Sequence, residues 1–474
     1  MQKDCKSLHF IGVGGIGMSA LAQMSASSGF HTTGSDRAIS SPENIRIFDA
    51  LRAQNVGLYP QDGSVYKSCT PDALVYSTAI EEDNPDFLNA PAGIPRLHRS
   101  AALKMLVESC KTENMIAVTG TCGKTSVTAQ LAEALYHAGA APGVLCGGLV
   151  NAFVSDTLAG NYCAGEGRVF VVEADESDKS LLNYTADTAV VLNIGTDHYP
   201  KEVLVEVFRQ FICNTRKNIV LSDDVLESVG ADACAGKNVI VFSSQSAGPE
   251  KIHGFPVVYL NSYRVGTDGV FCSLDGLPEI PLRAPGRHNA LNAAAVYATL
   301  RLLGYPKETA NTATGAFSGV WRRFDFAGKT EKGVSVYDDY AHNVEKILSC
   351  FEAAKSISTG RVFLIFQPHG FKPFEFMRET LFTELQKKLR KDDVFALLPV
   401  YYAGGTTSFS PTSAEVAAEF RSRSGTPDRY PDFADRTAAE NYLRNVPCAG
   451  ETVIVMGARD NSLSIWSKKI AENT

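Results

Sequence analysis

A short stretch near residue 120 constrains the fold of this chain more than any other part of its sequence. An apolar run, Met115–Val118, breaks into Gly120-Thr-Cys-Gly-Lys-Thr-Ser126, and a helix-forming stretch, Val127–His137, follows. Glycines after a buried strand let backbone N–H groups converge on an anion, and the N-terminus of the next helix adds its positive dipole end. The segment therefore predicts a strand–loop–helix unit that cradles phosphate groups.

The side chains of this loop indicate a nucleoside triphosphate. Lys124 can reach the β- and γ-phosphates, and the Thr125 hydroxyl can ligate Mg²⁺. Val118 stands where the standard phosphate loop has its first glycine, so this loop is shorter than usual. A glycine turn that merely opens a helix is the alternative. The residues expected to contact the nucleotide here are Gly120, Thr121, Cys122, Gly123, Lys124, Thr125 and Ser126.

Length and composition limit the class of protein. At 474 residues the chain is too long for one hydrophobic core and indicates about three domains. A net charge of −7 without a dense Lys/Arg tract argues against nucleic acid as a partner. No apolar run reaches membrane-spanning length, no signal peptide is recognisable, and the 11 cysteines form no C-x-x-C pair. We therefore expect a cytoplasmic protein with no membrane partner and with reduced thiols.

Short apolar strands alternate with helical patterns, which predicts an α/β fold with largely parallel sheets. We expect a Rossmann-like domain at 1–110, a central phosphate-loop domain at 111–320 and a second Rossmann-like domain at 321–474. Ser243–Ile280 reads as turn-rich, and helices are predicted at His288–Leu303 and Lys307–Phe317. Strands are predicted at Val169–Glu173, Thr188–Asn193, Asn218–Leu221, Val334–Asp338, Val362–Phe366, Val394–Leu398 and Thr452–Met456.

The N-terminal segment carries a dinucleotide fingerprint. Gly12-x-Gly14-x-x-Gly17 follows a predicted strand and opens a helix, and Asp36 lies nineteen residues beyond the last glycine. These features specify only a diphosphate at a helix N-terminus, so NAD and a sugar nucleotide both fit. Asp36 can contact the sugar of either ligand. A purely structural glycine turn is the alternative.

Acidic and imidazole side chains follow two predicted strands of the central domain. Glu173 ends a buried strand at the sheet edge where ligands of open α/β sheets bind, and it can ligate a metal opposite Thr125. His198, in Asn193-Ile-Gly-Thr-Asp-His198, ends the next strand and is either a ligand of a second divalent ion or a structural residue. Glu173 is followed by acids that are either site residues or a solvated turn, namely Asp175, Glu176 and Asp178.

Five residues further along complete the predicted chemistry. Asn289 and Asn292 lie three residues apart on one helix face, so both amides can meet one planar heterocycle, with a helix cap as the alternative for Asn289. Arg323 suits a transferring phosphoryl group. Asp339 and His342 follow a strand and suit contacts to the nucleotide ribose and to substrate, with a surface salt bridge as the alternative.

Taken in chain order, these motifs resemble the Mur ligase family, the ATP-dependent amino-acid ligases of peptidoglycan synthesis. The chain is most similar to the members that join L-alanine to UDP-N-acetylmuramate. The resemblance implies a UDP-sugar and not NAD in the first domain, ATP and Mg²⁺ (or Mn²⁺) in the central domain, and a mobile third domain that closes over the site. We expect a monomer or weak homodimer. The implied sugar-nucleotide contacts are Gly14, Gly15, Ile16, Gly17, Ser35, Asp36 and Ser77.

Several positions depart from the family pattern. Cys122 replaces a histidine, and His342 lacks the second histidine that usually follows it. Gln-Pro-His369-Gly stands where His-Arg-Tyr-x-Arg helps hold the incoming amino acid, so His369 with Lys372 or Arg378 is expected to bind the acceptor. The acceptor is therefore open between L-alanine, another amino acid and a preformed tripeptide used in recycling. The helix after the Asp-His turn has no lysine, which predicts no carbamylated lysine.

The resemblance implies a two-step reaction. The sugar carboxylate attacks the γ-phosphate of ATP to give an acyl phosphate, and the amine of the amino acid then displaces phosphate. Lys124, Glu173 and Arg323 are expected to neutralise charge, His198 to hold a second metal, and His342 to orient or deprotonate the amine. A nicotinamide dehydrogenase would leave Lys124 unexplained, and a non-enzymatic nucleotide switch would lack the paired metal residues.

Overall fold

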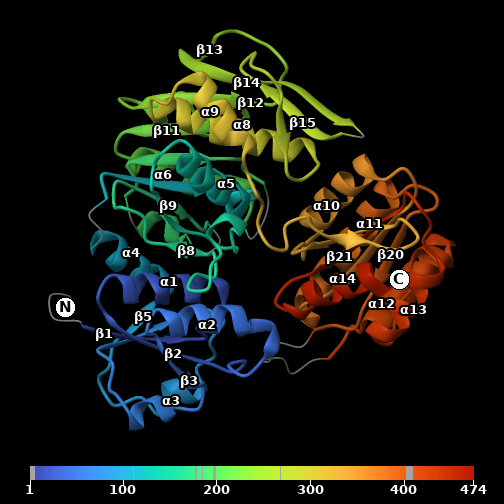
Figure 1. The fold of residues 1–474 in the computed structure, drawn as a ribbon, viewed down its shortest axis with the longest axis horizontal. Helices are drawn as coiled ribbons and strands as arrows, with labels where there is room; N and C mark the ends of the chain where they lie inside the picture. The colour runs from blue at the N-terminus through green and yellow to red at the C-terminus, as the bar shows by residue number, and fades with distance from the viewer. Residues whose placement is uncertain are drawn as a thin grey trace. The chain divides into compact units, whose positions relative to one another are not determined.

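The computed structural model describes residues 6–109, 112–176, 179–183, 185–195, 199–266, 268–401 and 409–473. The chain forms two compact units (Figure 1). The first holds residues up to 283 together with 288–321, and the second holds 284–287 together with the residues from 322 on. Helices alternate with strands in three sheets, so the predicted α/β class is confirmed.

The first sheet of the first unit is parallel, with the strand order β3-β2-β1-β4-β5. This is the order of a dinucleotide-binding fold, and its switch point lies between β1 and β4, next to the predicted glycine loop. The strands are β1 (Ser7–Ile11), β2 (His31–Asp36), β3 (Gly57–Pro60), β4 (Ala73–Tyr76) and β5 (Arg96–His98). The helices are α1 (Ile16–Ser27), η1 (Pro42–Asn44), α2 (Ile45–Ala53), η2 (Ser64–Lys67), α3 (Pro85–Leu88) and α4 (Arg99–Ser109).

The second sheet has the order β16-β15-β14-β12-β11-β10-β6-β9-β7-β8, with β13 paired to β14. Its centre, from β14 to β7, is parallel, whereas β8 pairs antiparallel with β7 at one edge and β13, β15 and β16 add antiparallel pairs at the other. The strands are β6 (Asn114–Thr119), β7 (Gly143–Leu145), β8 (Tyr162–Cys163), β9 (Val169–Glu173), β10 (Thr188–Val191), β11 (Asn218–Ser222), β12 (Asn238–Ser243), β13 (Lys251–Ile252), β14 (Phe255–Gly266), β15 (Gly269–Leu274) and β16 (Ile280–Leu282).

Helices cover both faces of this second sheet (Figure 1). One hydrophobic cluster joins Val127 of α5 and Tyr297 of α8 to one face. The other face shares a cluster with the first sheet, because Phe208 of α6 and Phe10 of β1 belong to the same continuous core. The helices are α5 (Lys124–His137), η3 (Asn151–Phe153), η4 (Ser180–Asn183), α6 (Lys201–Asn214), α7 (Asp223–Val229), η5 (Ala231–Cys234), α8 (Arg287–Leu302) and α9 (Lys307–Gly315).

The section predicted to be turn-rich, Ser243–Ile280, is mostly strand, so that prediction was wrong. Gly254 and Gly276 occupy hairpin ends, with positive φ angles of 87° and 72°. The residues between these turns pair over long antiparallel stretches, above all in β14 and β15. The predicted strands elsewhere differ from the observed ones by at most two residues at either end, and α5 begins three residues before the predicted helix.

The second unit contains the third sheet, in the order β17-β18-β21-β19-β20. It is parallel except for β17, and helices pack on both of its faces. Its strands are β17 (Asp325–Lys329), β18 (Ser335–Asp339), β19 (Val362–Gln367), β20 (Val394–Leu397) and β21 (Thr452–Gly457). Its helices are α10 (Val344–Ile357), α11 (Phe371–Lys388), α12 (Ser413–Ser424), η6 (Pro427–Arg429), α13 (Arg436–Asn445) and α14 (Ser462–Asn473).

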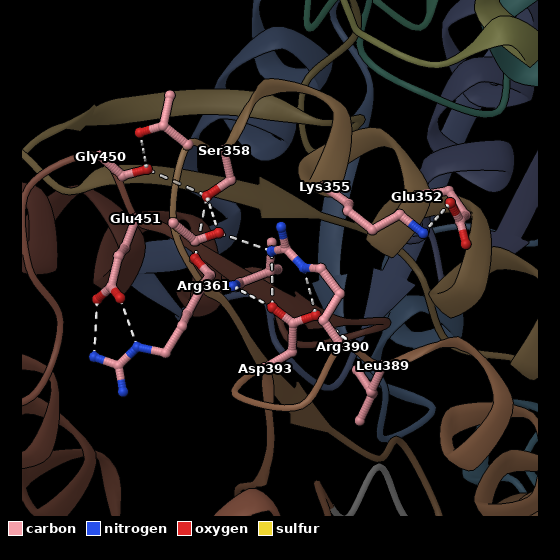
Figure 2. Close-up of polar contacts among 12 residues, drawn as sticks. Glu352, Lys355, Ser358, Arg361, Leu389, Arg390, Asp393, Gly450 and Glu451 are labelled. Atoms are coloured by element: carbon pink, nitrogen blue, oxygen red, sulfur yellow. Dashed lines mark hydrogen bonds and ion pairs between the residues drawn. The ribbon is translucent and has the colours of Figure 1, made fainter.

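A polar network fastens the N-terminal edge of the third sheet (Figure 2). Arg361 donates two hydrogen bonds to Glu451, at 2.5 and 3.1 Å, and the Arg390 guanidinium donates to both carboxylate oxygens of Asp393. These residues lie just before β19, β20 and β21, or in the turns that lead into them. These charged side chains pair with one another and stabilise the sheet. In open α/β sheets, ligands bind at the carboxyl ends of the strands, which here is the edge where His369 follows β19.

In the described part of the chain, no helix combines the length and the hydropathy that a membrane span needs.

Candidate functional site

The phosphate loop connects β6 to α5 and depends on two glycines. Gly120 has a φ of 140°, and a Cβ added there would lie 3.0 Å from Leu192 Cβ. Gly123 has a φ of 87° at the N-cap of α5, and an added Cβ would lie 2.8 Å from Asn292 Oδ1. Both positions therefore need glycine for conformation and for space. Ser126 lies in the first turn of α5, as the predicted loop–helix unit requires.

Asn193, which the sequence analysis did not single out, holds the tip of this loop. Its Oδ1 accepts hydrogen bonds from Thr121 Oγ1 at 2.8 Å and from Cys122 N at 2.9 Å, and its Nδ2 donates to Cys122 O at 2.9 Å. The Thr121 hydroxyl also accepts from Gly195 N at 2.9 Å. Cys122 thus contributes both backbone groups to the loop. Its position in the sequence could have identified it, because Asn193 comes at the end of a predicted strand, as Glu173 does.

Glu176 is the partner of the phosphate-loop lysine. Its Oε2 lies 2.7 Å from Lys124 Nζ, which also donates to Gly120 O at 2.9 Å. Burial lowers the pKa of Lys124, but the charge and hydrogen bond of Glu176, together with the charges of Glu173 and Asp175, outweigh it and raise that pKa. The Glu176 side chain is only 1% exposed, so the interpretation as a solvated turn was wrong for this residue. Asp175 is also paired, with Arg99 at 2.7 Å, while Asp178 lies outside the described residues.

Thr125 and Glu173 come together as predicted. Thr125 Oγ1 donates to Glu173 Oε1 at 2.9 Å, and Gly147 N donates to Glu173 Oε2 at 2.8 Å. An added Cβ at Gly147 would lie 2.7 Å from that same oxygen, so the backbone of this turn approaches the carboxylate as closely as glycine allows. A hydroxyl and a carboxylate in contact form the hard oxygen pair that Mg²⁺ prefers.

No other metal cluster assists this pair among the described residues, where no group of three His, Cys, Asp or Glu side chains is placed to hold an ion. His198, the third predicted metal ligand, lies outside the described residues, as does Asp197.

Asn289 and Asn292 lie in the first two turns of α8. Asn292 Nδ2 donates to Asn289 Oδ1 at 3.5 Å, so the two amides are adjacent, and Asn292 reaches the phosphate loop at Gly123. The capping alternative for Asn289 was wrong, because α8 begins at Arg287 and Asn289 lies inside the helix. The pair lies within α8, beside the phosphate loop.

The N-terminal glycine loop differs in detail from the prediction. Gly14 N donates to Asp36 Oδ2 at 2.8 Å, and Gly15 N donates to Gly12 O at 3.1 Å. The other Asp36 oxygen accepts from Ala38 N at 2.8 Å. Asp36, expected to contact a sugar, instead fastens the loop in this structure. The N–H groups of Gly14 and Gly15 are likewise used within the loop, which leaves the start of α1 for a diphosphate.

Ser35, predicted to contact the sugar nucleotide, is fully buried and donates its hydroxyl hydrogen bond to Asp86. Successive residues of a strand point to opposite faces, so Ser35 faces inward where Asp36 faces the loop. The prediction for Ser35 was therefore wrong. Ser77 follows β4 at the switch-point edge and is partly exposed, with its hydroxyl accepting from Ala79 N at 3.4 Å.

One cavity lies between α1 and the end of β9. It has a volume of about 90 Å³ and is lined at one end by Gly17 of α1 and at the other by Gly147 and Glu173. Arg99 and Ser100, at the start of α4, also line it. Arg99, which the sequence analysis missed, is the basic side chain among the described lining residues. Asp175 holds it there. The cavity is completed by Leu21, Leu103, Leu145, Cys146, Asp175 and Ser180.

In the second unit the two neighbouring arginines have different roles. Arg322 is 1% exposed, pairs with Asp338 at 3.1 Å, and donates to Gly457 O at 2.7 Å, so it is structural. Arg323 is partly exposed, with its guanidinium 5.4 Å from the centre of the Tyr340 ring. Arg322 has a positive φ of 58°, so the backbone turns sharply just before Arg323. The ion pair of Arg322 is therefore buried and lies away from the protein surface.

Asp339 positions this segment through its backbone contacts. Its two oxygens accept from Phe324 N and Ala341 N, both at 2.7 Å. The predicted ribose contact would have to share these oxygens.

His342 and His369 lie side by side at the carboxyl edge of the third sheet, with their ring centres 5.2 Å apart. Burial lowers the pKa of His342 to about 3 and that of His369 to about 4. His342 Nδ1 lies 2.8 Å from Tyr340 O and donates to it in the neutral ring, which leaves Nε2 as an acceptor. Lys372 is exposed in the first turn of α11. Arg378 pairs with Glu419 at 3.6 Å. Of the two predicted cations, Lys372 lies nearer to His369 along the chain.

The comparisons with known proteins agree with this geometry. Residues 7–110 match the model described as Mur ligase family, catalytic domain, 118–300 match the Mur ligase middle domain, and 322–459 match the Mur ligase, glutamate ligase domain. The UDP-N-acetylmuramate–L-alanine ligase of Mesorhizobium japonicum is 31% identical to the chain, over 97% of the chain and 96% of the relative. The chain belongs to the Mur ligase family.

Other Mur ligases are similar over most of their length. The UDP-N-acetylmuramate–L-alanine ligase of Clavibacter sepedonicus is 32% identical over 91% of the chain and 87% of the relative. The crystal structure of the UDP-N-acetylmuramate–alanine ligase of Thermotoga maritima shares the fold, with a TM-score of 0.75, 24% identity and 98% coverage of both chains. A murein peptide ligase of Psychrobacter arcticus also shares it, with a TM-score of 0.67, 20% identity and the same coverage.

Proposed function

We propose that this protein is an ATP-dependent ligase that joins L-alanine to the carboxylate of UDP-N-acetylmuramate in peptidoglycan precursor synthesis. Membership of the Mur ligase family and full-length relatives of that name support the proposal. The observation that carries it is the cavity between the first turn of α1 and the end of β9. It is lined by Gly17, beside the proposed diphosphate site, and by Glu173, which contacts Thr125 of the phosphate loop at 2.9 Å. A carboxylate in this cavity lies within reach of a γ-phosphate on the loop.

The reaction needs charge neutralisation more than a protein nucleophile. A carboxylate oxygen attacks the γ-phosphorus and the bond to ADP breaks, which leaves an acyl phosphate. The amine nitrogen then attacks the carbonyl carbon, phosphate leaves with the former carboxylate oxygen, and the nitrogen loses a proton. Lys124 remains charged beside Glu176 and binds the phosphates, and Arg323 stabilises the transferring group. Asn289 and Asn292 bind the adenine.

Thr125 and Glu173 fit a magnesium ion, since their oxygens are already in contact and part-buried. They would hold Mg²⁺, or Mn²⁺, together with His198. When bound, the ion would supply positive charge that offsets the negative charge of the phosphates.

His342 orients the incoming amine and does not act as the general base that removes its proton. An imidazole with a pKa near 3 is a weak base, but its unprotonated Nε2 can accept a hydrogen bond at any physiological pH. His369 and Lys372 bind the acceptor carboxylate at the start of α11. We also propose that the domains are 1–110, 111–320 and 321–474, and that the protein is cytoplasmic and a monomer or weak homodimer.

A recycling ligase that attaches a preformed tripeptide to the same sugar is the second candidate. The observation that favours it is the altered acceptor segment, Gln367-Pro-His369-Gly370, which has no arginine to grip a single amino acid.

Phosphate release tests both candidates. The pure protein is mixed with ATP, Mg²⁺ and UDP-N-acetylmuramate, and single amino acids or the tripeptide are added in turn. Turnover with L-alanine supports the first candidate, and turnover with the tripeptide alone supports recycling. Lys124→Ala is expected to abolish release, whereas Lys104→Ala, at a surface lysine 4.0 Å from Glu108, is expected to leave it intact. ATP binding without turnover in any mixture would contradict both.

A further inference from the structure

Asn161 is a fully buried side chain at the entry to β8, and it reaches into the first turn of α1. Its Nδ2 donates to Ile16 O at 2.7 Å and to Ser19 Oγ at 2.8 Å. Its Oδ1 accepts from Gln23 Nε2 at 2.9 Å. The side-chain amide of Asn161, which precedes a strand of the second sheet, thus hydrogen-bonds to α1 through both its nitrogen and its oxygen.

A second link extends the same network. Gln23 is fully buried, and its Oε1 accepts from Gln54 Nε2 at 3.1 Å. Gln54 Nε2 also lies 3.2 Å from Thr157 O, which belongs to the loop before β8. The polar contacts therefore cross from α1 and the end of α2 to the 157–161 segment at two places.

On its other side, Asn161 is connected to the phosphate loop. Its backbone oxygen accepts from Cys146 N at 2.9 Å. Cys146 lines the cavity, and its Sγ donates to Thr125 O at 3.6 Å. The next residue, Gly147, donates to Glu173. A single residue thus joins the start of α1 to the strand end that supports the Thr125–Glu173 pair.

We propose that Asn161 is a positioning residue for the ligation, one that fixes the sugar-nucleotide helix α1 at a set distance from the Thr125–Glu173 pair. Apolar contacts between the two layers tolerate sliding, whereas buried hydrogen bonds are directional and are costly to leave unmade. The register of α1 decides whether the sugar carboxylate meets the γ-phosphate in line. A misplacement of about 1 Å can cost on the order of 100-fold in rate.

The inference rests on the proposed function, and Asn161→Leu tests it. Leucine keeps the size of asparagine and removes its hydrogen bonds. We expect kcat to fall about 10- to 100-fold, while the separately titrated Kd values for ATP and UDP-N-acetylmuramate stay within about threefold, because each half-site is intact. Asn311→Leu is the matched control. Asn311 is also buried and donates to Pro278 O at 3.1 Å, so the variant loses stability but keeps its kcat.

Two further variants separate positioning from folding. Ser19→Ala removes one acceptor of Asn161 with little change in volume, and we expect a severalfold fall in kcat in a protein that melts near the wild-type temperature. Gln23→Leu combined with Asn161→Leu is expected to lower kcat no further than Asn161→Leu alone, because both break one network.

An Asn161→Leu protein that is folded at the assay temperature and has the wild-type kcat would overturn the inference alone. An Asn161→Leu protein with a raised Kd for ATP and an unchanged kcat would also overturn it. A wild-type protein that binds both nucleotides but never releases phosphate would instead overturn the proposed function.

Discussion

Replacing Asn193 by leucine is expected to weaken ATP binding more than any change to the Cys122 side chain. Asn193 makes three hydrogen bonds to the phosphate loop, at 2.8, 2.9 and 2.9 Å, and two of them hold the backbone of Cys122. Leucine has a similar size and can make none of them. The loop would then lose its fixed shape in the free protein and would have to be ordered by ATP itself.

The size of the effect follows from these contacts. A neutral hydrogen bond contributes about 1 kcal/mol net, so three of them contribute about 3 kcal/mol. If binding must supply that free energy, the Kd for ATP rises about 150-fold. The Kd for UDP-N-acetylmuramate is expected to stay unchanged, because the contacts of Asn193 shown here are to the phosphate loop.

Isothermal titration with ATP, and separately with UDP-N-acetylmuramate, measures both constants. Cys122→Ser is the matched control, since serine keeps the backbone groups that Asn193 holds, and its Kd for ATP is expected within about threefold of wild type. Equal ATP affinity in Asn193→Leu and wild type would refute the reasoning. A large loss in Cys122→Ser with none in Asn193→Leu would show that the side chain, and not the backbone, shapes the loop.

Three other predictions follow from the site. Arg99→Met removes the cation of the cavity and is expected to raise the KM for UDP-N-acetylmuramate about 10-fold or more without changing the Kd for ATP, because a hydrogen bond to a charged group contributes about 1.5–3 kcal/mol. Glu176→Gln removes the charge that raises the pKa of Lys124, so the alkaline limb of the pH–rate profile should move to lower pH, and an unmoved limb would contradict the pairing. His342 and His369 stay neutral when folded, whereas the unfolded chain binds protons below about pH 6.5. Their stability contribution is therefore present above that pH and lost as the pH falls, by about 1 kcal/mol per histidine between pH 7 and 5.5. Urea unfolding at both pH values measures it, and replacing both by glutamine should remove the loss.

The sequence predicted those parts of the site that are local in the chain. The phosphate loop, Thr125 and Glu173 were found because a strand, a glycine turn and a helix start follow one another directly, and strand ends meet at one edge of a parallel sheet. The α/β class followed from the same alternation of apolar strands and helices. Family membership followed from the order of the motifs along the chain.

The remainder depends on partners that lie far apart in sequence. Asn193 meets residues more than 70 positions away, and Arg99 pairs with Asp175 across 76 positions, so no local pattern reveals them. Glu176 looked like part of a solvated acidic turn because its partner, Lys124, lies on another element. Ser35 was the avoidable error, since the alternation of a strand places it on the face opposite to Asp36.

The fate of the carboxylate oxygens tests the central claim most directly. UDP-N-acetylmuramate labelled with ¹⁸O in its carboxylate is incubated with the protein, ATP, Mg²⁺ and L-alanine, and the released phosphate is analysed by mass spectrometry. Because the carboxylate attacks the γ-phosphorus and phosphate later leaves with that oxygen, each phosphate is predicted to carry one oxygen atom from the carboxylate. Amide product accompanied by unlabelled phosphate would contradict the account.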